Sequence, residues 1–408
     1  MVFQHKTQPA TFLEKWRTGS GPVSQTDADS LDPPAQSFDY SMIDTSETNM
    51  TQSRDLQTTI NPVAPSPVSR TLEKGADHNG KPSGAGLPGI IVKIKAYAAI
   101  ARPDHWFKNV FMVLGVLLAY FYQPQVFHHG AIVLHLLVAL LATCLIASSN
   151  YVLNEILDAP TDRSHPVKCN RPIPSGQIAL PVAYAEWILL GIVGLALAAW
   201  LNAAFFYSGL FLLIMGIVYN VPPIRSKELP YLDVLSESVN NPIRLMLGWF
   251  AVTSSEFPPL SLLVSYWMIG AFFMATKRLA EYRYIGDPVA AGAYRSSFKH
   301  YDEQKLLISM FFYTTCFALF LGVFIIRYRL ELILLFPLVA GFVCYYLYVA
   351  FKKDSAAQNP ERLYKEKGLM IYLVVCVVAF FVLMLVGIEP LYHWFNVQPS
   401  NVDPLWKF

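Results

Sequence analysis

Asparagine and aspartate side chains recur at a fixed spacing in the segment 154–176, NEILDAPTDRSHPVKCNRPIPSG. Asn154, Asp158 and Asp162 follow an i, i+4, i+8 pattern, so a helix would bring all three to one face. Two carboxylates one turn apart can hold Mg²⁺, a hard cation that takes oxygen ligands and keeps waters for substrate phosphates. Three cations that could bind phosphate oxygens follow on the same segment: Arg163, Lys168 and Arg171.

A second acidic pair, Asp233 and Glu237, also follows an i, i+4 spacing and lies in the segment 219–244. Glu237 and Arg244 fall in an apolar stretch, where an isolated charge is expensive, so each should face a cavity and pair with another group. The alternative is a structural ion pair within the helix bundle. The remaining candidates on this segment are Tyr219, Arg225 and Lys227.

Two shorter segments add cations to the same set. Residues 275–283, ATKRLAEYR, contribute Lys277, Arg278 and Glu281, although their alternative role is to anchor a membrane helix at the cytoplasmic surface. Residues 101–109, ARPDHWFKN, contribute Lys108, which points either at lipid headgroups or into the site. Acids and cations around one cavity fit Mg²⁺ that bridges a diphosphate, and they favour a reaction in which the diphosphate departs.

Membrane-spanning helices must position these side chains, because only 15% of the 408 residues are charged and 54% are hydrophobic. Soluble proteins carry roughly 25% charged residues, so an ordinary soluble enzyme is excluded. The net charge of +2 gives no reason to expect a nucleic-acid partner. The five cysteines form no disulfide framework and no cysteine-based zinc site, since four of them lie in apolar runs and Cys169 stands alone in a loop.

Nine apolar segments are each near the ~20 residues that a helix needs to cross a bilayer. Lipid offers the backbone no hydrogen bonds, so each should be a helix; the sequence predicts an all-α polytopic membrane protein. The fifth segment is the weakest, because it contains Glu237, Pro242 and Arg244. The segments cover about 106–122, 131–153, 178–201, 203–220, 232–252, 261–281, 305–326, 330–351 and 368–387.

The distribution of Lys and Arg predicts the orientation. Most of these residues lie in the loops after the second, fourth, sixth and eighth segments, whereas the opposite loops carry only Arg327 and Arg329. Positive loops stay cytoplasmic, so the candidate site and the N-terminus should lie on the cytoplasmic side. We expect three regions: a disordered polar tail at 1–90, a membrane domain at 91–395 and a short tail at 396–408.

These motifs resemble the UbiA superfamily of intramembrane prenyltransferases, a fold of nine transmembrane helices around a central cavity. The aspartate-rich motif NDxxDxxxD of that family matches NEILDAPTD at 154–162, and its second acidic motif falls on Asp233–Glu237. The resemblance covers roughly residues 100–390. The decaprenyl-phosphate phosphoribosyltransferase branch is the most similar, on the strength of RPDHWFKN (102–109), DRSHPVKCNRPIPSG (162–176), LDVLSESVNNPIRLMLGW (232–249) and KRLAE (277–281).

The resemblance implies that phosphoribosyl pyrophosphate is the donor and a polyprenyl phosphate the acceptor. Asp158 and Asp162, assisted by Asn154, would hold the diphosphate through Mg²⁺, the implied cofactor. Asp233 and Glu281 would bind the ribose hydroxyls or orient nearby cations. The phosphates would be held by Lys108, Lys277 and Arg278. The rest of the implied substrate-binding set is Arg163, Arg171, Arg225, Lys227, Glu237 and Arg244.

The sequence departs from the family pattern at three places. Glu155 replaces the usual aspartate after Asn154, which keeps the charge and lengthens the reach. Pro160 lies between Asp158 and Asp162, so a kink is expected there. Two prolines at 222–223 predict a stiffer loop than the family's usual link.

Two other functions fit the same residues. A prenyl diphosphate donor, for prenyl transfer or terpene cyclisation, would use the same Mg²⁺ and diphosphate clusters, but a carbocation needs an apolar, aromatic pocket. A ribosyl donor needs hydroxyl partners instead. A transporter or lipid-binding scaffold would show matching broken helices in two halves, and the sequence contains no convincing repeat.

Overall fold

The structure is a computed structural model that describes residues 95–123, 130, 132–163, 168–353, 355–358 and 360–398. The predicted tail at 1–90 and most of the predicted C-terminal tail lie outside the described residues.

The part of the chain that the structure describes contains helices and turns and no β-strand, as the apolar segments predict. Eight helices there are long and apolar enough to cross a membrane. They comprise Lys95–Tyr122, which includes α2 (Phe111–Tyr122), then α3 (Ile132–Asp162), α4 (Leu180–Leu201), α5 (Ala203–Asn220), α8 (Leu260–Ile285), α10 (Glu303–Tyr328), Leu330–Ala350, which includes α11 (Phe336–Ala350), and α12 (Lys367–Leu385).

The predicted fifth span is broken into two short helices, α6 (Leu232–Ser238) and α7 (Asn240–Val252), which meet at Val239. Pro242 lies in the first turn of α7, where its missing N–H leaves no helical hydrogen bond unmade. The 13 residues of α7 are fewer than the ~20 that cross a bilayer. The count of nine transmembrane helices therefore stays a prediction.

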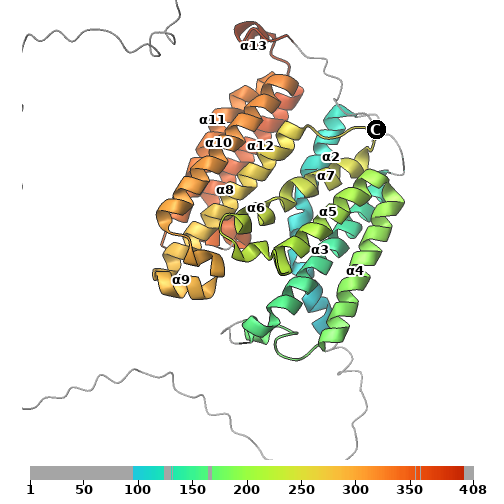
Figure 1. Ribbon diagram of the computed structural model, residues 1–408. Coiled ribbons are helices and arrows are strands. Elements are labelled where there is room, and N and C mark those ends of the chain that lie inside the picture. Colours follow the sequence, from blue (N-terminus) through green and yellow to red (C-terminus); the bar gives the residue numbers. More distant parts are fainter. Residues whose placement is uncertain are drawn as a thin grey trace, which may run out of the picture. The chain divides into compact units, whose positions relative to one another are not determined.

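The long helices pack in two groups, which Figure 1 shows side by side. α2, α3, α4, α5 and α7 form one group, and their buried apolar side chains make one core cluster, which includes Trp249 and Phe250. α8, α10, α11 and α12 form the other group, with a core that includes Phe272 and Phe298. α6 contacts α5, α7 and α8, so it connects the two groups at the level of the candidate site.

α2 and α7 approach so closely that glycine is needed on both helices. A methyl group on Gly248 would lie 1.9 Å from the carbonyl oxygen of Met112, and one on Gly115 would lie 2.0 Å from the carbonyl oxygen of Leu245. Both obstacles are backbone atoms, which cannot move aside without shifting a helix. The contact fixes α7, which carries Arg244, against the first span.

Replacing Gly248 by alanine is therefore expected to push α7 away from α2. Overpacking of this kind costs typically about 1–3 kcal/mol, so the thermal unfolding temperature of the detergent-solubilised protein should fall. The matched control is Gly322→Ala in α10, where nothing lies within 4 Å of the added methyl group. Helix propensity there predicts an unchanged or slightly higher unfolding temperature. Equal unfolding temperatures for the two variants would contradict the assigned α2–α7 contact.

Candidate functional site

The first polar cluster lies at the C-terminal end of α3. This helix runs through Pro160 and ends at Asp162, so Asn154, Asp158 and Asp162 lie on one continuous helix. Pro160 is in the last turn, where its missing N–H removes one i→i−4 hydrogen bond, and the expected kink does not interrupt the helix. The three side chains thus keep the i, i+4, i+8 relation.

Asp158 meets cations from the loop after α5. Lys227 Nζ donates to Asp158 Oδ1 at 2.5 Å, and the guanidinium of Arg225 donates to the same oxygen at 3.1 Å. Lys227 Nζ also donates to Asn220 Oδ1 at 3.0 Å, which in turn accepts from Asn154 Nδ2 at 2.6 Å. Burial lowers the pKa of the Lys227 ammonium, and the carboxylate of Asp158 opposes that shift. The loop is thereby tied to the acidic face of α3.

Asp162 is held by the other cationic loop. Arg171 donates to Asp162 Oδ2 at 2.8 Å, and Lys168 Nζ lies 3.8 Å from Oδ1. The Asp162 side chain is only 5% exposed, compared with 24% for Asp158. Arg163 follows at the end of α3 and is exposed. Asp158 is therefore the more accessible of the two carboxylates.

Glu155, the residue that departs from the family motif, lies off the acidic face. Its side chain is buried, and Oε1 accepts the backbone N–H of Ile173 at 3.1 Å. The longer side chain thus reaches the loop that carries Arg171. We interpret Glu155 as a positioning residue for that loop and not as a metal ligand.

The second polar cluster is centred on Arg278, near the C-terminal end of α8. Its guanidinium donates to Asp233 Oδ2 at 3.0 Å, to Glu281 Oε2 at 3.1 Å and to Glu237 Oε2 at 3.3 Å. Lys277 Nζ lies 3.9 Å from Glu281 Oε1. The candidates of two sequence segments therefore meet in one cluster.

Asp233 is completely enclosed, with an exposed fraction of 0%. Ser297 Oγ donates to Oδ2 at 3.1 Å, and the Tyr301 hydroxyl donates to Oδ1 at 2.7 Å. Together with Arg278, these groups occupy both carboxylate oxygens. This arrangement favours the orienting role for Asp233 over direct contact with a substrate, and a part of Asp233 in catalysis, which the resemblance also implies, stays a prediction.

Glu237 is the accessible acid of this cluster, since its side chain is 34% exposed. The Tyr219 hydroxyl donates to Glu237 Oε2 at 3.0 Å. Arg244 does not meet Glu237 in the ion pair considered above. It is buried, and its Nε donates to Asn109 Oδ1 at 3.0 Å, while a terminal nitrogen donates to the carbonyl of Asn240.

The segment 101–109 packs against α3. Trp106 Nε1 donates to Ser148 Oγ at 2.9 Å, so this indole has a partner within the bundle. The Lys108 ammonium lies 6.0 Å from the ring centroid of Tyr151, a residue of α3. The contact places Lys108 against α3, and its role in binding phosphate stays a prediction.

Sequence reasoning does not identify Asn220, Ser297 and Tyr301 as site residues. Asn220 follows Tyr219 directly at the end of an apolar segment, and a polar residue at that position is a usable signal. Ser297 and Tyr301 reach Asp233 from a segment that is 64 and 68 residues away in sequence. No local pattern marks a contact of that range.

The first cluster has the donor chemistry that Mg²⁺ requires, namely an amide and two carboxylates. Among the described residues no group of three or more His, Cys, Asp and Glu side chains is arranged to hold a metal ion. A hydrated Mg²⁺ that also binds phosphate needs one or two carboxylates from the protein. Asp158 fits that requirement, with Asn154 and Asp162 one turn away on either side.

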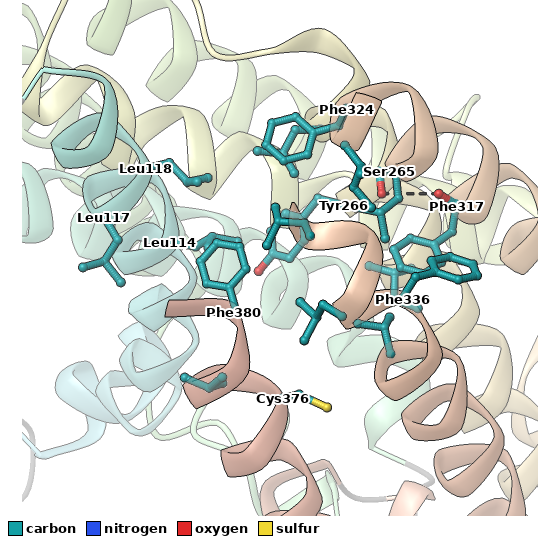
Figure 2. Close-up of a pocket in the computed structure, with 18 of the residues that line it drawn as sticks. Leu114, Leu117, Leu118, Ser265, Tyr266, Phe317, Phe324, Phe336, Cys376 and Phe380 are labelled. Atoms are coloured by element: carbon teal, nitrogen blue, oxygen red, sulfur yellow. Dashed lines mark hydrogen bonds between the residues drawn. The ribbon is translucent and has the colours of Figure 1, made fainter. Parts of the chain in front are cut away.

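An apolar cavity of about 380 Å³ lies farther along the bundle, between α2, α8, α10, α11 and α12. Figure 2 shows Leu114, Tyr266, Phe317 and Phe380 around it. Its lining residue Ile269 and the site residue Lys277 are both on α8, eight residues or roughly 12 Å apart along the axis. An aliphatic chain bound there would thus lie within reach of the polar clusters.

The sequence model of the UbiA prenyltransferase family matches residues 109–374. A decaprenyl-phosphate phosphoribosyltransferase from Mycolicibacterium smegmatis is 31% identical over 185 residues, which are 44% of this chain and 55% of that protein. A protoheme IX farnesyltransferase 2 from Pseudomonas paraeruginosa is 28% identical over 207 residues, 48% of this chain and 66% of that protein. The chain thus spans about half the length of the curated phosphoribosyltransferases that it matches.

Solved structures show the same fold. A UbiA homologue from Archaeoglobus fulgidus, bound to GPP and Mg²⁺, superimposes with a TM-score of 0.53. The two proteins share 19% sequence identity, and the match covers 71% of this chain and 100% of the homologue.

Proposed function

Because the chain belongs to the UbiA prenyltransferase family and is an integral, multi-pass membrane protein, we propose that it is a Mg²⁺-dependent intramembrane transferase. Its reaction would transfer phosphoribose from phosphoribosyl pyrophosphate to a polyprenyl phosphate, with release of diphosphate. The site would face the cytoplasm, in line with the distribution of Lys and Arg.

The observation that carries this proposal is the presence of two separate clusters, each of which contains cations as well as carboxylates. One diphosphate needs the cluster at Asp158. The second cluster, at Arg278, adds Lys277 and Lys108, and it would have no phosphate to bind if the donor were a prenyl diphosphate and the acceptor were uncharged. The proposed substrates carry two phosphate groups besides the diphosphate. One is the 5-phosphate of phosphoribosyl pyrophosphate, and the other is the phosphate of the lipid.

In this reaction an oxygen of the lipid phosphate forms a bond to the anomeric carbon of the ribose. The bond from that carbon to the diphosphate breaks, and the diphosphate leaves with the electron pair. Mg²⁺, when bound, would neutralise charge on the leaving group. Asp158 and Asn154 would hold the ion, and Lys227 and Arg225, which contact Asp158, would bind diphosphate oxygens.

The remaining residues would orient these groups. Asp233 would fix the guanidinium of Arg278, and Glu155 would fix the loop that carries Arg171. The polyprenyl chain would occupy the apolar cavity, so that only its phosphate enters the polar site. Arg244, whose guanidinium donates to Asn109, would contribute positive charge to the site.

A prenyl diphosphate donor is the second candidate. The apolar cavity favours it, since Phe317, Phe324 and Phe380 give the aromatic lining that a carbocation requires. The farnesyltransferase relative named above is consistent with the same reading.

An assay of the detergent-purified full chain separates the two candidates. One reaction receives labelled phosphoribosyl pyrophosphate, a polyprenyl phosphate and Mg²⁺; another receives prenyl diphosphates with and without an aromatic acceptor. We expect a labelled phosphoribosyl lipid that is lost with EDTA and restored by excess Mg²⁺. If only the reactions with prenyl diphosphates gave products, a ribosyl donor would be rejected. Turnover in the presence of EDTA would reject the requirement for Mg²⁺.

A further inference from the structure

Arg295 lies beside the second cluster and was not among the predicted site residues. It separates α9 (Pro288–Tyr294) from the short 3₁₀ helix η5 (Ser296–Lys299). Ser297 and Tyr301, just after it, both donate hydrogen bonds to the buried carboxylate of Asp233. These two contacts hold the segment that contains Arg295 against α6. The same helix carries Glu237, one turn after Asp233.

The guanidinium of Arg295 is only partly used by the protein. Its Nε is buried and has no hydrogen-bond partner within the part of the chain that the structure describes. The guanidinium carbon lies 6.0 Å from the ring centroid of Phe298, which holds the side chain by a cation–π contact. A buried donor without a partner costs free energy, so a ligand that supplied an acceptor would be favoured.

The surroundings of Arg295 carry an excess of positive charge. Glu237 Oε2 accepts from Arg278 at 3.3 Å, and Lys277, Lys108 and Arg295 lie close enough to act on it electrostatically. Glu281 and Asp233 are already bound to Arg278. Four cations against three carboxylates leave room for an anion, and Glu237 and Lys277 are the members that solvent can reach.

The residue before Arg295 lies near a cation of the first cluster. This residue, Tyr294, has the Lys168 ammonium 5.9 Å from its ring centroid, and the same nitrogen is 3.8 Å from Asp162 Oδ1. A ligand whose diphosphate is bound at Asp158 and Asp162 could therefore reach Arg295 with another group. The planar guanidinium suits a phosphate, because it can donate two parallel hydrogen bonds.

We propose that Arg295 binds a phosphomonoester group of a substrate, separate from the diphosphate at the first cluster. The inference rests on the proposed function, in which two phosphomonoesters are available. One is the 5-phosphate of the ribosyl donor, and the other is the headgroup of the lipid acceptor. Arg295 would then distinguish donors that carry a second phosphate from those that carry a diphosphate alone.

Equilibrium binding to the full-length protein in detergent tests the proposal without turnover. The probes are ribose 5-phosphate, farnesyl monophosphate and inorganic diphosphate with Mg²⁺. We expect Arg295→Gln to weaken one of the monoesters on the order of tenfold and to leave diphosphate unchanged, since a charge-assisted hydrogen bond is lost. A loss for ribose 5-phosphate identifies the donor as the source, and a loss for farnesyl monophosphate identifies the lipid.

Two further variants keep the test decisive. Arg283→Gln removes another arginine of the same region, one that pairs with Glu303 and is 39% exposed, and all three affinities should stay unchanged. Arg295→Lys keeps the positive charge but not the two parallel donors of the guanidinium. It should therefore give an intermediate loss of monoester affinity, even if Arg295→Gln unfolds. Unchanged monoester affinities in both Arg295 variants, or an equal loss for diphosphate, would overturn the proposal. If no phosphoribosyl lipid formed while monoester binding still depended on Arg295, the proposed reaction would be rejected and the role of Arg295 in binding would stand.

Discussion

Asp158→Asn is expected to reduce turnover by roughly a hundredfold or more while the protein remains folded. A metal stabilises transition-state charge by several kcal/mol, and each 1.4 kcal/mol or so is a factor of ten in rate. In the native protein Lys227 Nζ lies 2.5 Å from Asp158 Oδ1, and the one oxygen of the asparagine amide can still accept from this ammonium. Loss of the negative charge should therefore weaken Mg²⁺ more than it disturbs the loop. Initial rates across a Mg²⁺ titration provide the measurement.

Glu228→Gln is the matched control for this experiment. Glu228 accepts from Arg225 Nε at 2.6 Å on the outer side, and its side chain is 46% exposed. The substitution removes a carboxylate from the same arginine without touching the acidic face of α3, and turnover should change little. If Asp158→Asn retained full activity at every Mg²⁺ concentration, Asp158 would not be the metal ligand.

The sequence is sufficient to predict the helical fold and to bring the acidic candidates of the first cluster together, because both follow from local patterns. Hydropathy alone locates the long helices, and the four-residue spacing puts Asn154, Asp158 and Asp162 on one face. The break of the fifth segment at Val239 could be suspected only from the polar residues and the proline that follow it.

The partners of the buried charges could not be predicted in the same way. Arg244 binds Asn109 across 135 residues of sequence, and Asp233 receives Tyr301 across 68. Such pairs depend on how helices pack, and the sequence of each helix is equally compatible with other partners. Glu155 illustrates the point, since its sequence position within the motif does not reveal that its carboxylate accepts the backbone N–H of Ile173.

The largest expected effect on stability belongs to Arg278, whose side chain is 1% exposed. Arg278→Gln would leave the completely buried Asp233 with hydroxyl donors alone. Breaking a buried ion pair by removing one partner costs about 3–5 kcal/mol, because an uncompensated charge remains. We expect a clearly lower thermal unfolding temperature in detergent. Lys277→Gln, at the adjacent and partly exposed position, should leave the unfolding temperature nearly unchanged even if it impairs turnover.

A double substitution distinguishes charge burial from a general loss of packing. If the cost of Arg278→Gln arises from the unpaired Asp233, then Asp233→Asn in the same chain removes the charge and should recover part of the lost stability. The amide oxygen can still accept from Tyr301, and the amide nitrogen can donate to Ser297 Oγ, so these contacts from the segment of Arg295 need not be lost. Additive losses in the double variant would mean that the two residues stabilise the fold independently. The recovery expected here would instead assign to Asp233 the role of holding a buried cation, which is the role its enclosure favours.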